Sequence, residues 1–442
     1  MNQARNLLLA ASLGAAFTFA TALGRSAEAP LPIPALGDEE SLVRYALAHN
    51  PELSASGWDQ AISQAQVGSA SALSNPVARA EWLHVQSPEN YGFGLGLEWS
   101  PPQPGVYGAR TASARAEARA ARDDFRERAA DLEAKVRSAH AQIVALEQEL
   151  ALAEKSVGTR RRIHQAVKER VARGAATRID LSLIAVSLAR GEQERDLLVL
   201  ARASATSELE SLLGLLAGQS LAQVAGPTPS PPEPSAPEPS TPPAGDGSQR
   251  ADAELVQRAR SARPQIRADR ARTEAADQIL AAERAKRYPW LELQARYRRH
   301  DQANYPNDLT LGLAITLPIL SQNSGPIAAA EATRAQQREL ALAHRLGIER
   351  DVRVLRAESL RRGQIAAHYE AEIAPVLAEH AALVQQALTG MELDLTAVLS
   401  AEDMVTRGSI EYVEARLAQQ RAEILLQRAL GNYGKAAPTR RE

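Results

Sequence analysis

The sequence repeats its landmarks at a spacing of about 215 residues. Residues 43–51 (VRYALAHNP) return as residues 256–264 (VQRARSARP), and three later landmarks recur in the same order: Gly94 and Gly312, Gly174 and Gly390, Leu213-Gly214 and Leu430-Gly431. A repeat this long indicates a duplicated structural half, because solenoid units are only about 20–50 residues long. Each half is expected to contain a helix, two short strands, a very long helix and a second helix.

The duplication predicts a simple domain plan. Residues 1–29 are expected to be a signal peptide, 30–220 the first structural repeat and 251–433 the second. A proline-rich linker, 221–250, joins the repeats, and residues 434–442 form a disordered tail. The linker contains nine prolines between residues 227 and 243, which is typical of a stiff, extended spacer. A docking peptide is the alternative interpretation of this segment.

The N-terminus has the features of a secretory signal. Arg5 precedes an apolar stretch, residues 7–23, and Ala27-Glu28-Ala29 fits a small-x-small cleavage site. A membrane anchor is the alternative, but the segment is short and rich in alanine. The chain has no cysteine, so it has no disulfide and no cysteine to acylate. Its formal charge of −2 and 24% charged residues give no reason to expect a nucleic-acid partner.

Helical patterns fill most of both halves. We expect helices over residues 39–73, with a break at Pro51, over 105–171, and over 179–216. The second half repeats this plan over 251–287, 327–388 and 395–430, with a bend near Pro375. Residues 105–171 contain no proline, and a helix of this length would be on the order of 100 Å long.

Residues 91–99 alternate strictly between two kinds of side chain, which predicts a β-strand with two different environments. The apolar face of this strand and of its counterpart after residue 308 consists of Tyr91, Phe93, Leu95, Leu97, Trp99, Leu309, Leu311, Leu313, Ile315 and Leu317. Two noisier strands precede them, with Arg79, Glu81, Glu292, Gln294 and Arg296 on the face opposite Trp82, Leu293 and Tyr297.

Two environments could explain the apolar face. In a soluble sheet it would pack on a core, whereas in a transmembrane β-barrel it would face lipid. The barrel is favoured, because the strands are long enough to cross a bilayer and no other segment supplies a core. Four strands cannot close a barrel, since about eight is the smallest size, so the chain must oligomerise. A trimer would supply twelve strands.

The pattern resembles the TolC family of outer-membrane efflux proteins over about residues 38–433. The resemblance depends on the duplicated AxxxNPEL-like starts (46–53 and 259–266), the paired strands and the paired RGxxT-like turns. It is closest to the heavy-metal CzcC branch, because of Asn75-Pro76 and the segment LPILSQNSGPIAAAEA at 317–332. The family implies a mainly α fold with a small β part: a homotrimer with a 12-stranded β-barrel on a 12-helix α-barrel.

The resemblance also implies partners and site residues. The helix–helix turns would be periplasmic tips that meet an adaptor (membrane fusion) protein coupled to an inner-membrane RND-type pump: Arg173, Gly174 and Thr177 in the first turn, and Thr389, Gly390 and Met391 in the second. Asp180 matches an acidic gate position of the family. Its counterpart after Gly390 is Thr396, while Glu392 and Asp394 lie nearby, out of register. These three acidic residues are the gate candidates; solvated side chains are the alternative.

Nothing in the sequence indicates catalysis or a resident cofactor. There is no HExxH, GxSxG or phosphate-binding glycine loop, and the eight histidines are scattered without i,i+4 spacing. We therefore expect no enzyme, no cofactor and no metal site. The predicted function is an outer-membrane exit duct, with heavy-metal cations as the favoured substrate. Multidrug efflux or type I secretion is the alternative, and a periplasmic coiled-coil adaptor or a soluble scaffold is less favoured.

Overall fold

Two sets of elements follow the same order along the chain, as the repeated landmarks predict. The computed structural model describes residues 33–84, 91–216, 221, 246–300, 307–390 and 395–434. The first set is α1 (Glu39–His49), α2 (Pro51–Ser71), β1 (Val77–His84), β2 (Tyr91–Trp99), α3 (Pro104–Ala172) and α4 (Arg178–Leu213). The second is α5 (Asp246–Ala262), α6 (Pro264–Ala285), β3 (Trp290–His300), β4 (Asp308–Thr316), α7 (Ser324–His368), η1 (Tyr369–Ile373), α8 (Ala374–Gly390) and α9 (Leu395–Ala429).

Each half begins with two helices separated at an X-Pro step. The Asn50 side chain accepts from the Leu53 N–H at 2.9 Å and donates to the Leu212 carbonyl at 2.9 Å, so it caps α2 and ties the break to α4. Pro51 follows as the first helical residue, where its missing N–H costs nothing. The predicted break at Pro51 is confirmed. In the second half, the predicted continuous helix 251–287 is wrong, because Pro264 separates α5 from α6 in the same way.

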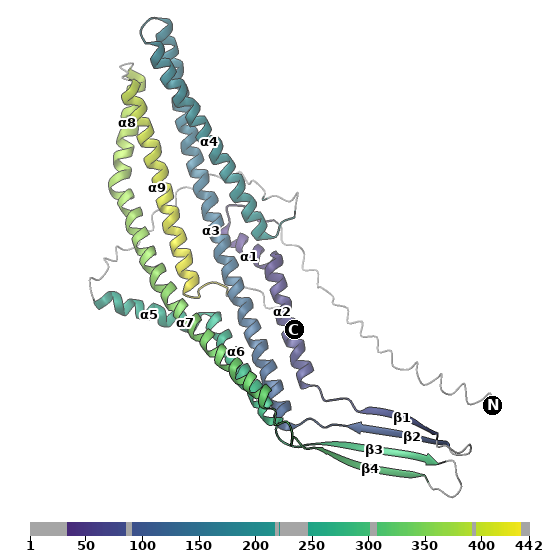
Figure 1. The fold of residues 1–442 in the computed structure, drawn as a ribbon. Coiled ribbons are helices and arrows are strands. Elements are labelled where there is room, and N and C mark those ends of the chain that lie inside the picture. The colour runs from purple at the N-terminus through teal and green to yellow at the C-terminus, as the bar shows by residue number, and fades with distance from the viewer. Residues whose placement is uncertain are drawn as a thin grey trace, which may run out of the picture. The chain divides into compact units, whose positions relative to one another are not determined.

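Long helices dominate both halves (Figure 1). α3 has 69 residues, so its length is on the order of 100 Å. It packs against α2 and α4 on one side and against α6 and α9 on the other. The second long helix is interrupted: a π-helical turn, η1, separates α7 from α8 directly before Pro375. Proline removes one intrahelical hydrogen bond, which accounts for an irregularity at this place.

Several sequence predictions fall wholly or partly outside the described residues. These are the signal peptide, the proline-rich segment 227–243 and the tail beyond residue 434. The predicted linker, 221–250, extends five residues too far, because α5 begins at Asp246 and residues 246–250 are helical.

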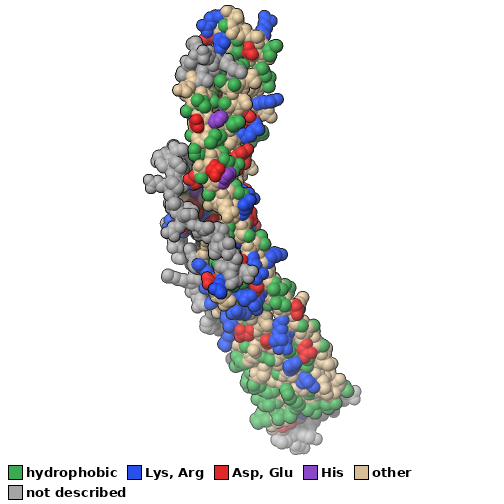
Figure 2. Space-filling model, turned by 90° about the vertical axis from the view of Figure 1, so that its left-hand side faces the viewer, with side chains coloured by type: hydrophobic (Ala, Val, Ile, Leu, Met, Phe, Trp, Pro, Cys, Tyr) green, Lys and Arg blue, Asp and Glu red, His purple; other side chains and the backbone are tan. Residues whose placement is uncertain are grey.

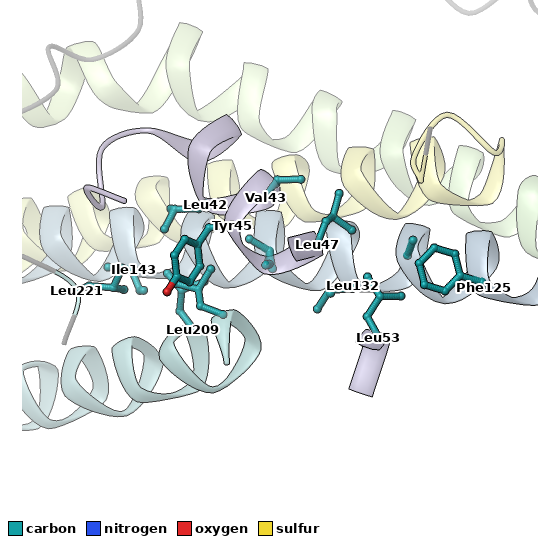
Figure 3. Close-up of a cluster of buried hydrophobic side chains, with 14 residues drawn as sticks. Leu42, Val43, Tyr45, Leu47, Leu53, Phe125, Leu132, Ile143, Leu209 and Leu221 are labelled. Atoms are coloured by element: carbon teal, nitrogen blue, oxygen red, sulfur yellow. The ribbon is translucent and has the colours of Figure 1, made fainter. Parts of the chain in front are cut away.

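The hydrophobic core lies where the short starting helix of each half packs on the long helices. In the first half, Leu42, Tyr45 and Leu47 of α1 pack with Ile143 of α3 and Leu209 of α4 (Figure 3). The second half has an equivalent cluster formed by α5, α6, α7 and the end of α9. The duplication therefore extends from the sequence pattern to the packing of the core.

The repeated Leu-Gly landmarks end α4 and α9 beside these cores. Gly214 and Gly431 both adopt left-handed backbone, with φ of +73° and +75°. A Cβ on Gly214 would lie 2.7 Å from the carbonyl oxygen of His49, and one on Gly431 would lie 3.1 Å from Ala262. Glycine is required at both positions for backbone conformation and for the close approach of the starting helix.

Candidate functional site

The sheet has two chemically different faces across all four strands. The strands are antiparallel in the order β1-β2-β3-β4, and Trp82 pairs with Phe93, Leu95 with Tyr297, and Leu293 with Leu313. Directly paired residues point to the same side of a sheet. The apolar side chains predicted on β2 and β4 therefore share one face with apolar residues of β1 and β3. Of those predicted side chains, Tyr91 alone is not among the side chains that the structure describes.

This apolar face is exposed in the single chain. The Trp82 and Leu311 side chains are 83% and 78% exposed, and every large hydrophobic residue of β4 is exposed. Figure 2 shows hydrophobic side chains gathered at the strand-bearing end of the unit, with charged side chains along the helices. A contiguous apolar surface of this kind marks contact with a membrane or a partner. Trp82 lies on this apolar face, opposite Arg79 and Glu81, as the alternation in its strand predicts.

The opposite face of the sheet is polar and carries the glycines. Arg79 pairs with Glu98 at 3.0 Å across β1 and β2. Gly96 lies directly between Arg79 and Arg296, its partners on the two neighbouring strands. A strand position without a side chain leaves room for the long side chains beside it. One face is thus built for an apolar environment and the other for water.

Tryptophans fix the sheet to the helical part. The Trp99 Nε1–H donates to the Ser74 carbonyl at 2.9 Å, and the Trp290 Nε1–H donates to the Pro101 carbonyl at 2.6 Å. Both rings therefore lie at the strand ends with satisfied N–H groups, as expected at a boundary between apolar and wet surroundings. Leu317 lies one residue beyond β4, so its placement on the strand was wrong, although it is exposed.

The turn between α3 and α4 is fixed by its own backbone. Gly174 has a φ of +74°; its N–H donates to the Val171 carbonyl at 3.0 Å, and the Ala175 N–H donates to the Arg170 carbonyl at 2.8 Å. These two bonds define a Schellman motif, which explains the glycine at this position. Nothing lies within 4 Å of a Cβ placed on Gly174, so the tip has open space around it.

Thr177 and Asp180 start α4 with a reciprocal capping box. The Asp180 N–H donates to Thr177 Oγ1 at 3.1 Å, and the Thr177 N–H donates to the Asp180 carboxylate at 2.8 Å. The backbone and hydroxyl hydrogen bonds from Thr177 lower the pKa of Asp180. The gate candidate in the first turn therefore has a local structural role as an ionised helix cap.

The second turn is only partly described. α8 ends at Gly390, which follows Thr389, and α9 begins at Leu395. Met391, Glu392 and Asp394 lie outside the described residues, so their predicted roles stay predictions. The helical hairpin formed by α3 and α4 meets the hairpin formed by α8 and α9 near the tips. There, Ile163, Val167 and Ile184 pack against Val384, Leu395 and Val398.

A buried ion pair joins the two hairpins further along. Arg160 of α3 donates through Nε to Glu402 of α9 at 2.9 Å and through Nη1 to the Ser187 carbonyl of α4 at 2.9 Å. The side chains of Arg160 and Glu402 are only 5% and 6% exposed. Ser156 and Thr406 also donate to the Glu402 carboxylate, so the buried charges are paired and hydrogen-bonded. Sequence reasoning missed this contact, because its members are 242 positions apart.

Among the described residues, no three His, Asp or Glu side chains come together in a way that could hold a metal ion. No helix there has an apolar stretch sufficient to cross a membrane.

Comparison with known proteins links this geometry to one family. The profile of the outer membrane efflux protein family matches residues 42–218. The cobalt-zinc-cadmium resistance protein CzcC of Cupriavidus metallidurans is 26% identical over 222 residues, which are 50% of this chain and 49% of CzcC. The alignment thus spans about half the length of that relative.

Two solved structures share the fold over nearly the whole chain. The outer-membrane channel OprN is 18% identical with a TM-score of 0.72, covering 90% of this chain and 91% of its own. CusC is 18% identical with a TM-score of 0.70, covering 89% and 92%. At this identity the likeness concerns the fold alone: a mainly helical chain with a small antiparallel sheet. The resemblance predicted from the repeated landmarks is confirmed.

Proposed function

We propose that this chain, which matches the model of the outer membrane efflux protein family over residues 42–218, forms the outer-membrane exit duct of a tripartite efflux system. Three copies would close twelve strands into a β-barrel, and their long helices would form a tunnel through the periplasm. The repeats 30–220 and 251–433, joined by the linker, would each supply half of a protomer's wall. Transport would use the energy of the pump, and the duct itself would perform no chemistry.

One observation carries the proposal: the sheet exposes apolar side chains along one face of all four strands and polar side chains along the other. Lipid outside and water inside a barrel would satisfy these two faces. Closure with further copies would also pair the free edges of β1 and β4. The predicted signal peptide, residues 1–29, would fit export to the outer membrane.

The hairpin tips are the proposed contact with a periplasmic adaptor. In the first turn, Gly174 has open space around it and Arg173 and Thr177 flank it. Thr389, Gly390 and Met391 would form the second contact. The adaptor would connect the duct to an inner-membrane RND-type pump. Asp180, Glu392 and Asp394 remain the proposed acidic positions at the tunnel entrance.

We propose heavy-metal cations as the substrate, because the similarity to CzcC covers half of this chain. A duct that only passes metals needs no tight metal site, since tight binding would slow release. A multidrug or type I secretion duct is the alternative, because this fold alone does not select a substrate.

The substrate is tested by deleting the gene and exposing the strain to divalent metals, dyes, detergents and antibiotics. Hypersensitivity limited to metals such as cobalt, zinc or cadmium, reversed by the intact gene, is the expected result. Hypersensitivity to bulky organic compounds would replace the metal assignment with a multidrug duct. Unchanged resistance to the whole panel would refute the efflux role.

The membrane-facing side of the sheet is tested with two neighbouring residues of β4. Leu311 lies on the apolar face and Thr310 on the polar face, and both are exposed in the single chain. An arginine facing lipid costs about 2–4 kcal/mol near the bilayer centre. Leu311→Arg should therefore reduce the yield of outer-membrane trimers, whereas Thr310→Glu, which places a charge opposite Arg296, should leave it unchanged. Equal yields from the two variants would contradict a lipid-facing Leu311.

A further inference from the structure

One face of α3 carries a row of arginines that transport through a duct does not explain. Arg115, Arg119, Arg122 and Arg126 follow one another at spacings of four, three and four residues. Residues three and four apart lie on the same face of a helix. The four guanidinium groups therefore form one line along α3, which we call the arginine row.

The row lies in a groove between α2 and α6, which both pack against α3. The groove consists of two hollows of about 490 and 300 Å³ that share Arg122. Gln60, Gln64 and Val67 line it from α2, while Arg267 and Glu274 line it from α6.

The groove has an excess of positive charge. Arg119 pairs with Glu274 at 2.8 Å, and Asp123 pairs with both Arg126 and Arg267 at 3.2 Å. Within the described part of the chain, Arg115 and Arg122 have no ion pair or side-chain hydrogen bond, and both are exposed. Five guanidinium groups thus face two carboxylates, so the groove has a net charge of +3.

The fold covers this same face of α3 where complementary groups are available. Further along the helix, Arg137 contacts Glu39 and Glu40 of α1, and the Gly434 N–H donates to Glu133 at 2.9 Å. Positions 133 and 137 continue the spacing of the arginine row. The row therefore continues a face that elsewhere binds acidic side chains, and the other described residues leave it uncovered.

We propose that the arginine groove binds an extended acidic peptide segment of a partner protein. From Arg115 to Arg126 the helix rises about 16 Å, which equals about five residues of extended chain. Alternate side chains of such a peptide lie about 6.6 Å apart, close to the rise of about 4.5–6 Å between successive arginines. Guanidinium groups bind carboxylates through paired hydrogen bonds.

Other lining groups favour a peptide over a lipid headgroup. The amides of Gln60 and Gln64 can donate to and accept from a peptide backbone. Arg115 lies eleven residues, about 16 Å, along α3 from Pro104, the end of the helix nearest the strands. That distance exceeds the headgroup layer of a bilayer, about 5–8 Å. The inference goes beyond the proposed function, since the groove can bind in the absence of transport.

The test is peptide binding by the full-length protein in nonionic detergent. A fluorescein-labelled (Glu-Ala)4 peptide should bind, and its affinity should fall as salt is added. Arg115→Ala/Arg122→Ala should weaken binding at least about tenfold, because it removes two charge-assisted contacts. These two side chains have no partner in the described residues, so the fold should be preserved. Arg128→Ala/Arg161→Ala, at two other exposed positions of α3, is the matched control and should change binding less than twofold.

Several results would overturn the proposal. These are a lack of binding at low salt, equal binding of a neutral (Gln-Ala)4 peptide, or an equal loss in the control variant. Polyphosphate and anionic phospholipid vesicles are tested in parallel. Tighter binding of either one that depends on Arg115 and Arg122 would replace the acidic peptide with a phosphate-bearing ligand.

Discussion

Replacing Arg160 with methionine should destabilise the protein by about 3–5 kcal/mol, because the Glu402 carboxylate would remain buried without its cation. The two side chains are 5% and 6% exposed, so solvent screens their interaction little. Arg160 also bonds the Ser187 carbonyl, so the variant loses contacts to both α9 and α4. The effect should be concentrated where the two hairpins meet.

The adjacent residue supplies a matched control. Arg161 pairs with Glu192 at 2.6 Å, but its side chain is 56% exposed, and exposed pairs contribute only about 0–1 kcal/mol. Arg160→Met/Glu402→Leu removes both buried charges and should recover most of the loss, because apolar replacement of a complete buried pair is often neutral. Ser156, Thr406 and the Ser187 carbonyl would then need new partners, which limits the recovery to within about 1–2 kcal/mol of the wild type.

Urea unfolding of the detergent-solubilised chain, followed by circular dichroism, gives these differences, and hydrogen exchange locates them on α3 and α9. The reasoning is refuted if Arg160→Met unfolds like Arg161→Met. It is also refuted if the double variant is no more stable than the Arg160→Met single variant.

The same unfolding assay tests two further predictions. Gly174→Ala should lower the free energy of unfolding by about 1–2 kcal/mol, because alanine is strained in left-handed backbone. Gly214→Ala should lower it further, because the added Cβ would also lie 2.7 Å from the His49 carbonyl oxygen. Equal losses of stability in the two variants would contradict this close approach. Burial and the nearby Glu414 raise the pKa of Glu149 above its ordinary 4.5, so ionising Glu149 weakens the fold as pH rises through the raised pKa. Glu149→Gln should therefore be more stable than the wild type at pH 7.5 and similar to it near pH 4; a difference that is unchanged between these two pH values would exclude the linkage.

Patterns between neighbours in the sequence determined most of the elements. The alternation in residues 91–99 predicted β2 and its two faces, and Pro51 predicted the first helix break. The paired Leu-Gly landmarks indicated the duplication, although the helix predicted to run to residue 216 ends at Leu213. The failures were also local: Leu317 lies just past β4, the linker ends before Asp246, and Pro264 breaks a helix that was predicted to be continuous. Terminal residues are the least certain part of any pattern, since helix and strand ends depend on contacts outside the element.

The tertiary structure alone decided which distant residues meet. Strand register paired Trp82 with Phe93 and Leu293 with Leu313, so that the apolar faces of the four strands became one surface. Helix packing buried Arg160 against Glu402 and put α2 and α6 on either side of the arginine row. The physical reason is the distance along the chain over which each kind of information extends. Periodicity reports the environment of each side chain along its own element, whereas ion pairs, grooves and register depend on which elements lie side by side.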